Sequence, residues 1–384
     1  MTVTLRGLAW DHRRCWGPLD ASIAPYGAGH PGVQIQWDRR SLYEFGEGRL
    51  EDVLRQYDLI VFDHPFIGDI ARDRLMVPFD ARLDAAARAR FAADSVGGSW
   101  RSYEYDGAQW ALPIDAAAQV ASCRPDLLTR YADAMPANHA EVLDLGRRLR
   151  ADGKWIGLPF VPTDAMCLVM TLAAGRGDRV GADGCFLPRD AVEAIIDELR
   201  ALAALAHPAS ADWNPIRCYD HMVGHDDVVY TPYAFGYVNY SAPASGPRLR
   251  FGNIPAEGAR GSLLGGAGIG VSAFSAHPEA AADYALFLCA PDYQRGDYVR
   301  SGGQPGSLAA WRDAEANRIT GNFFADTLAT LANSYLRPTH PGFITFFREA
   351  THPAAEAIAG RLPARALADR LDTLYAASLP ETTA

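Results

Sequence analysis

The chain has 384 residues, of which 49% are hydrophobic and 21% are charged, and its net charge is −10. This composition is typical of a folded globular protein, and the negative charge argues against nucleic-acid binding, which requires a basic face. A single hydrophobic core stops growing near roughly 250–300 residues, so the length predicts two domains. No segment of the sequence approaches the ~20 uninterrupted apolar residues that a membrane span needs, so we expect no span.

The cysteines and the N-terminus bear on the compartment. The six cysteines are widely separated: Cys15, Cys123, Cys167, Cys185, Cys218 and Cys289. They form no C-x-x-C pair and no zinc-type cluster with histidine, so they favour single buried residues in a reducing compartment. Residues 3–10 alternate like a first strand, and no secretory leader precedes them. As written, the sequence predicts a cytoplasmic protein; if a leader has been removed, a periplasmic one.

Strand and helix patterns alternate through the N-terminal part. Strands are predicted over 3–10, 33–37 and 58–62, with helices over 18–29 and 50–57 between them. The first two strands alternate with period two, and the third is a continuous apolar run, as in a buried parallel strand. This order predicts an α/β fold with a doubly wound parallel sheet and right-handed crossovers.

Polar and aromatic residues follow the first and third predicted strands. Trp10, Asp11 and His12 follow the first, and Asp63 and His64 follow the third. Because ligands of such sheets bind beyond the carboxyl ends of the strands, we expect both groups to face one crevice. Their polar atoms suit a hydroxylated ligand, and the indole offers a flat face to a sugar ring. Alternatively, Asp11 and Asp63 cap the following helices and Trp10 belongs to the core.

The rest of the chain changes character several times. A hairpin with an Asp106-Gly107 turn is predicted over 103–113, and a strand starts at 112–115. Helices follow over 125–131, over 138–151 with Asn138 as the cap, and over 191–206. A polar aromatic loop is expected over 213–240, a glycine-rich crossing between domains over 252–270, and several helices from 278 onward.

Four blocks, in the expected order, resemble the family 1 extracellular solute-binding proteins, which include the sugar-binding components of ABC transporters. The most diagnostic is LLGGAGIGVSAFSAHPEAAADYALFLCAPDYQRGDYVRSGGQPGS (263–307), and the others are 103–128, 221–241 and 334–361. In the block 103–128, Arg124 stands where the family usually has asparagine. The lipoprotein-type cysteine of the family is also missing.

The resemblance implies a two-lobed type II periplasmic-binding-protein fold with a ligand cleft between the lobes, closed by hinge motion. Block matching assigns 1–112 and 263–305 to lobe 1 and 115–258 and 308–384 to lobe 2. The hinge crossings are expected near 111–116, 255–264 and 303–310. The family also implies a monomer that binds a small molecule and, if exported, an ABC permease.

The resemblance adds further candidate ligand residues. Asp115 lies on a crossing strand, and its alternative role is a hinge hydrogen bond. Asp164 precedes a helix, so the alternative is an N-cap. The remaining candidates are aromatic residues of the second lobe and glycines whose amides could approach the ligand: Tyr233, Phe235, Tyr237, Gly265, Gly266 and Gly268. For these, the alternatives are aromatic packing and a tight turn.

Two functions of different class remain open. The first is a binding protein for a hydroxylated solute, or for a carboxylated one held by Arg6, Arg13 or Arg14. The second is a cytoplasmic enzyme, such as an acid-base lyase, hydratase or hydrolase, in which His12 or His64 is the general base, oriented by Asp11 or Asp63. Neither needs a cofactor, and these Asp-His pairs match no known metal spacing, so no metal is expected there.

Overall fold

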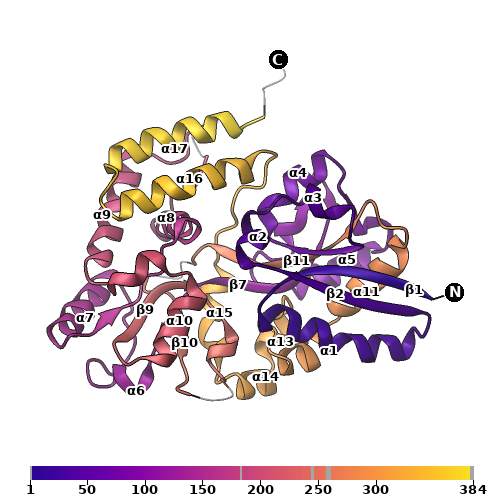
Figure 1. The fold of residues 1–384 in the computed structure, drawn as a ribbon, viewed down its shortest axis with the longest axis horizontal. Coiled ribbons are helices and arrows are strands. Elements are labelled where there is room, and N and C mark those ends of the chain that lie inside the picture. Colours follow the sequence, from indigo (N-terminus) through magenta and orange to yellow (C-terminus); the bar gives the residue numbers. More distant parts are fainter. Residues whose placement is uncertain (1, 182–183, 244–245, 257–260, 381–384) are drawn as a thin grey trace. The chain divides into compact units, whose positions relative to one another are not determined.

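The computed structural model describes residues 2–181, 184–243, 246–256 and 261–380 (Figure 1). Contacts within the chain divide it into two compact units. Unit 1 comprises Met1–Ala117, Gly265–Phe324 and Thr339–Ile344, and unit 2 comprises Ala118–Leu264, Ala325–Pro338 and Thr345–Ala384. Residues 257–260 of the expected crossing over 255–264 lie outside the described part, and the expected lobe boundaries stay predictions.

Unit 1 is built on a mixed sheet. Strand β1 (Val3–Trp10) pairs in parallel with β2 (Val33–Arg40) and with β3 (Leu59–Phe62). Strand β11 (Leu264–Ser272) runs antiparallel to β3, and β4 (Met76–Val77) pairs with the end of β11. The three predicted N-terminal strands are confirmed, but the all-parallel sheet is wrong, because a strand from far along the chain enters beside β3 in the opposite direction.

Helices cover both faces of this sheet. Alternate residues of β1 point to opposite faces, and Leu5 belongs to the cluster that includes side chains of α1 (Arg13–Gly29) and α11 (Pro278–Leu288). The cluster on the other face includes side chains of α3 (Glu51–Leu54) and α4 (Ile67–Arg72). The carboxyl ends of β1 and β3 are thereby held between two packed layers.

Two predicted features of unit 1 have mixed outcomes. Helix α1 begins at Arg13, so Pro18 lies inside the helix, not in its first turn as predicted. The hairpin is confirmed, with Asp106 at φ 49° and Gly107 at φ 76° in its turn. The remaining elements of unit 1 are α2 (Leu42–Glu47), η1 (His64–Phe66), η2 (Phe79–Ala81), α5 (Ala85–Ala93), η3 (Arg101–Tyr103), β5 (Glu104–Tyr105), β6 (Ala108–Gln109), α12 (Pro291–Tyr293), η6 (Gln294–Tyr298), α13 (Leu308–Arg312) and α14 (Ala314–Ile319).

Strand β7 (Leu112–Cys123) is fully buried and runs from unit 1 into unit 2. In unit 2 it pairs antiparallel with β10 (Arg250–Gly252) and with β9 (Val228–Phe235), and β9 pairs in parallel with β8 (Trp155–Ile156). The polar aromatic loop expected over 213–240 is wrong, because this segment contains the helix α10 (Pro215–Gly224) and the buried strand β9.

The helices of unit 2 follow the predicted pattern more closely. Asn138 caps α7 by accepting a hydrogen bond from the Glu141 amide at 3.0 Å, as predicted. Helix α9 contacts both α8 and α17 (Figure 1). The remaining bounds are α6 (Pro125–Leu128), α7 (His139–Ala151), α8 (Pro162–Arg176), α9 (Arg189–Ala203), η4 (Pro208–Asp212), η5 (Val238–Tyr240), α15 (Phe323–Ala332), α16 (Phe343–Ile358) and α17 (Ala364–Ser378). Among the described residues, no helix combines the length and the hydropathy that crossing a bilayer requires.

Candidate functional site

The carboxyl ends of the three parallel strands of unit 1 form one edge of its sheet. Trp10, the last residue of β1, pairs in register with Arg40, the last residue of β2. Asp11 and His12 follow β1 directly, and Asp63 follows the neighbouring β3. The predicted grouping of these residues at one edge therefore follows from the parallel pairing of the strands.

The Trp10 side chain is 3% exposed and lies in the core cluster of unit 1, with its ring centroid 4.7 Å from that of Phe45. Arg40 is also buried, and it donates a hydrogen bond to the Val61 carbonyl at 3.0 Å. Burial lowers the pKa of Arg40 to about 10. The core role of Trp10 is thus observed, and its contact with a ligand stays a prediction.

Asp11 and His12 have different surroundings. The Asp11 side chain is 63% exposed and lies 3.9 Å from Arg39. The helix cap is His12, whose Nδ1 accepts a hydrogen bond from the Arg14 amide at 3.1 Å, so the alternative that Asp11 caps α1 is wrong. Burial first, and then the charge of Arg14, lower the pKa of His12 to about 4. His12 is therefore neutral near pH 7.

Asp63 and His64 form a local pair after β3. The Asp63 carboxylate accepts a hydrogen bond from the His64 amide at 2.8 Å and so caps η1, as the alternative interpretation predicted. It also lies 3.1 Å from Nδ1 of His64, whose side chain is 1% exposed. Asp63 keeps 16% of its side chain exposed. Of the two residues, Asp63 is therefore the one that can meet a ligand from solvent.

A buried ion pair supports this edge from within unit 1. Nε of Arg14, in the first turn of α1, donates to Asp115 of β7 at 2.7 Å, and a second guanidinium nitrogen contacts the other carboxylate oxygen. The side chains are 4% and 0% exposed. Burial raises the pKa of Asp115, and the bidentate contact with Arg14 opposes that rise. Asp115 is engaged by the chain's own guanidinium, and ligand contact there stays a prediction.

The glycines Gly265, Gly266 and Gly268 lie in strand β11, not in a turn. Gly266 has φ 116°, and a Cβ atom there would lie 2.4 Å from the carbonyl oxygen of Asp115. A Cβ at Gly268 would meet the ring of Tyr103 at 2.6 Å. These two glycines thus permit close packing around β11, and approach of their amides to a ligand stays a prediction.

The candidates of unit 2 lie mostly in its core. Asp164 is 6% exposed in the first turn of α8, but the cap of this helix is Val161, so the N-cap alternative is wrong. Tyr233 is 2% exposed, and its hydroxyl donates to the Pro255 carbonyl at 3.2 Å. Phe235, at the end of β9, is half-buried, and Tyr237 lies beyond the strand and is buried. Ligand contact of these residues stays a prediction.

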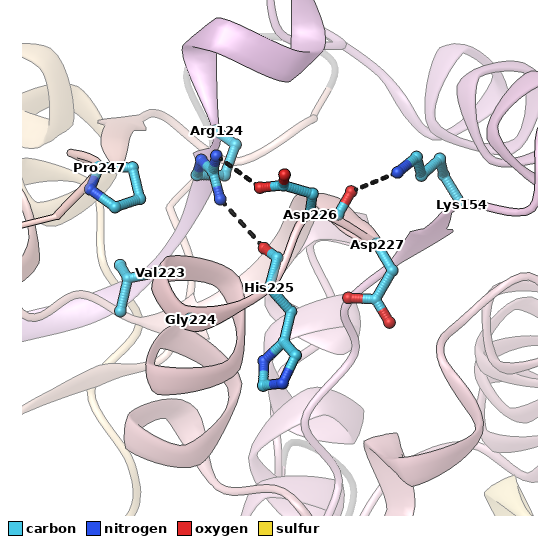
Figure 2. Close-up of a pocket in the computed structure, with 8 residues that line it drawn as sticks. All are labelled: Arg124, Lys154, Val223, Gly224, His225, Asp226, Asp227 and Pro247. Carbon is cyan, nitrogen blue, oxygen red and sulfur yellow. Dashed lines mark hydrogen bonds and ion pairs between the residues drawn. The ribbon is translucent and has the colours of Figure 1, made fainter.

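A pocket within unit 2 has none of the predicted ligand residues in its lining. Figure 2 shows its lining residues: Arg124, Lys154, Val223, Gly224, His225, Asp226, Asp227 and Pro247. Arg124 donates to the Asp226 carboxylate at 2.9 Å and to the His225 carbonyl at 3.0 Å, and Lys154 donates to the Asp226 carbonyl at 2.8 Å. Both cations thus hold the turn between α10 and β9. This gives Arg124 a structural role at the position where the resembled family has asparagine.

Sequence reasoning missed three features of this geometry. It considered Arg14 as a binder of a ligand carboxylate, whereas Arg14 pairs with Asp115 of the same chain, 101 positions away. It also missed the buried Arg40 and the pocket around Arg124. The strand predicted over 33–37 ends before Arg40, and no local pattern tells which distant carboxylate or carbonyl a buried cation will meet.

Comparison with known protein families shows the family of this chain. The family model described as bacterial extracellular solute-binding protein matches residues 22–315. No curated protein matches the sequence. Among solved structures, maltose-bound MalE3 of T. maritima is similar, with a TM-score of 0.83 and 16% identity over 98% of this chain and 100% of that one.

Two further solved structures are similar over nearly the whole chain. The GacH receptor of Streptomyces glaucescens, solved unliganded and with acarbose, has a TM-score of 0.81 and 14% identity over 99% of both chains. A solute-binding protein of an ABC transporter from Agrobacterium radiobacter, in complex with ribitol, has a TM-score of 0.77 and 16% identity over 97% of both chains. These likenesses confirm the predicted two-lobed α/β fold.

Proposed function

The chain belongs to the family of bacterial extracellular solute-binding proteins, and we propose that it binds one small hydroxylated solute at the carboxyl ends of β1 and β3. The side chains proposed to meet the solute are Asp11, His12 and Asp63, which combine polar atoms with at least partial exposure. Carboxylate oxygens accept hydrogen bonds from hydroxyl groups, which makes them suited to sugars and polyols.

The charges at this edge of the sheet favour an uncharged ligand. Arg14, in the first turn of α1, is bound by Asp115, and both side chains are buried. His12 is neutral near pH 7, since its pKa is about 4. Arg6, another candidate for holding a carboxylate, donates to Asp38 at 2.7 Å. Of the three arginines considered for a carboxylated solute, Arg6 and Arg14 are therefore already paired within the chain. Only Arg13 is exposed without an ion pair among the described residues, which favours an uncharged ligand beside Asp11 and Asp63.

The similar structures support the same ligand class. The T. maritima protein is maltose-bound, and the A. radiobacter protein is in complex with ribitol. For this chain we extend the proposal to neutral sugars and polyols in general. The family supports three further parts of the proposal. We propose that the protein closes by hinge motion on binding, that it functions outside the cytoplasm and that it delivers its solute to an ABC permease.

Catalysis by the two Asp-His pairs is not favoured. A general base needs an available lone pair within reach of the substrate and a pKa near the working pH. Nδ1 of His12 is used by the cap bond, and the pKa of this histidine is about 4. The His64 side chain is 1% exposed, so a substrate in solution does not reach it.

A thermal-shift screen of the full chain against sugars, polyols and organic acids tests the proposal, with product analysis of every hit. A ligand that binds the native state raises the melting temperature by mass action. At a free concentration of 100 times its dissociation constant, it adds roughly 2.7 kcal/mol to the free energy of unfolding. We expect neutral sugars or polyols to be the hits and to be recovered unchanged. Hits confined to organic acids would refute the ligand class, and a hit recovered as a different compound would refute the binding function.

A further inference from the structure

Two histidines and one aspartate converge in unit 2, whereas the residues proposed to bind the solute belong to unit 1. His221 Nε2 lies 2.8 Å from one carboxylate oxygen of Asp227, and His207 Nε2 lies 3.4 Å from the other. One donor atom from each of the three residues falls within 4.8 Å of the other two. The side chains of His207 and His221 are each 18% exposed, and that of Asp227 is 35% exposed. The three residues thus bring partly buried metal-ligating atoms close together.

The backbone around β8 fixes two of these residues. The Trp155 amide donates to the Asp227 carbonyl at 2.8 Å, and the His207 amide donates to the Ile156 carbonyl at 2.9 Å. Because β8 is held between the two segments, His207 and Asp227 are positioned by a strand, not by a loose loop. The third residue, His221, lies on α10. The Asn214 side chain caps this helix by accepting from the Arg217 amide at 2.9 Å.

Aromatic packing holds the imidazole rings. Trp213 stacks on His207, with centroids 4.7 Å apart and planes at 10°, and it lies 4.6 Å from His221. His225 stacks on His221, with ring centroids 4.3 Å apart and ring planes at 13°. Rings that are already oriented lose little conformational entropy when they bind a ligand. The cluster therefore meets the positional requirement of a ligand site.

We propose that His207, His221 and Asp227 form a binding site for a divalent transition metal of the Zn²⁺ type. Imidazole nitrogen and carboxylate oxygen are ligands that Zn²⁺ takes at about 2.0–2.2 Å, in tetrahedral geometry. At such bond lengths, neighbouring ligand atoms lie about 3 Å apart or slightly more. The Nε2 atoms of His221 and His207 lie 2.8 Å and 3.4 Å from the Asp227 oxygens, which is close to this separation. Three protein ligands leave one position for water. Harder ions such as Mg²⁺ and Ca²⁺ prefer oxygen ligands, so this site selects against them.

Metal binding has a defined cost at His207. Its Nδ1 now accepts a hydrogen bond from the Ala209 amide at 3.2 Å, so the ring proton resides on Nε2 and faces Asp227. A neutral histidine that binds metal through Nε2 carries its proton on Nδ1 instead. The bond from Ala209 is then lost, and the turn η4 must move its amide. The contacts of His207 and His221 with Asp227 are also exchanged for the three metal–ligand bonds.

Of the three proposed metal ligands, Asp227 lines the pocket of Figure 2. His225 also lines this pocket. A metal ion bound by the three ligands would tie together the segment before η4, the helix α10 and the start of β9. Such ligation contributes stability to unit 2 because the unfolded chain lacks a preformed site. This role is independent of the solute proposed for unit 1.

Calorimetric titration of Zn²⁺ into the full, tag-free chain tests the proposal. We expect one ion per chain with a dissociation constant in the micromolar range or below. His221→Gln and Asp227→Asn should each weaken binding by at least about 100-fold, since removing even an outer-shell partner costs 10–100-fold. The matched control is His139→Gln. His139 lies 2.9 Å from Glu198, a histidine–carboxylate pair without a second histidine, and this variant should bind as the parent does.

The opposite results overturn the proposal. Millimolar binding by the parent chain, or an equal loss in the His139→Gln control, would show that Zn²⁺ binds surface groups without a built site. If a variant fails to fold, the parent chain with Co²⁺ decides instead. Ligation by two imidazoles and a carboxylate gives visible d–d absorption that saturates at one equivalent and is displaced by Zn²⁺. Absence of this absorption overturns the proposal.

Discussion

Replacing Arg14 by methionine is expected to destabilise unit 1 strongly. The guanidinium of Arg14 and the carboxylate of Asp115 are 4% and 0% exposed and make a bidentate contact. Methionine keeps much of the apolar volume of arginine but leaves Asp115 buried without its cation. Breaking one side of a buried pair typically costs 3–5 kcal/mol, because the remaining charge is uncompensated. We expect a loss of about this size near pH 8.

The loss should depend on pH in a defined direction. Burial raises the pKa of Asp115, and removing the opposing charge of Arg14 raises it further. The folded variant then keeps a proton that the unfolded chain, with a carboxyl pKa of about 3.9, has already released. Stability therefore falls as pH rises through the raised pKa, and the variant should recover part of its loss at pH 5.

Differential scanning calorimetry at pH 5 and pH 8 measures both effects. For a domain of 150–250 residues, 1 kcal/mol corresponds to about 2–4 °C, so the transition of unit 1 should fall by about 6–20 °C at pH 8. The matched control is Arg39→Met. Arg39 pairs with Asp20 at 3.0 Å with both side chains more than a third exposed, so this variant should lose under about 1 kcal/mol. Equal losses in the two variants, or a loss that ignores pH, would refute the reasoning.

Two further predictions concern the same unit. Gly266→Ala should cost more than about 1 kcal/mol, because φ is 116° and the new Cβ would lie 2.4 Å from the Asp115 carbonyl oxygen. Gly27→Ala, in the open surroundings of α1, should instead stabilise by about 0.5–1 kcal/mol, and urea unfolding compares the two. The pKa of His12 is about 4 when folded and about 6.5 when unfolded, so stability is lost as pH falls through this window, by roughly 3 kcal/mol. His12→Asn keeps a cap acceptor, and urea unfolding at pH 7 and pH 4 should show this part of the acid loss removed; an unchanged acid loss would contradict the assigned shift.

Local periodicity and capping chemistry were enough to predict several elements of the fold, chiefly in the N-terminal part of the chain. Strand β1, the hairpin turn at Asp106-Gly107 and the Asn138 cap all depend on residues close together in sequence, so the local pattern contains the needed information. The prediction of a loop over 213–240 was wrong because the polar and aromatic residues of this segment form both α10 and β9. The prediction of an all-parallel sheet was wrong for another reason. Strand β11 pairs antiparallel with β3, and the pairing of strands far apart in sequence has no local signal.

The candidate site was predictable only in part. The rule for parallel sheets placed Asp11, His12 and Asp63 correctly at the carboxyl ends of their strands. It could not tell that His12 rather than Asp11 caps α1, because this depends on where the backbone enters the helix. Nor could spacing indicate that Arg14 would be bound by Asp115, since the two meet only through tertiary packing.

The central claim is that a neutral solute binds at the carboxyl ends of β1 and β3. The most direct test is calorimetric titration of a sugar or polyol hit into Asp63→Ala and Asp84→Ala. Both aspartates are helix caps, since Asp84 accepts from the Ala87 amide at 2.6 Å, so each variant should lose a similar ~1 kcal/mol of stability. We predict that Asp63→Ala weakens binding at least about tenfold, the effect of 1.4 kcal/mol, while Asp84→Ala binds as the parent chain does. Equal affinity in the two variants would contradict the proposed site.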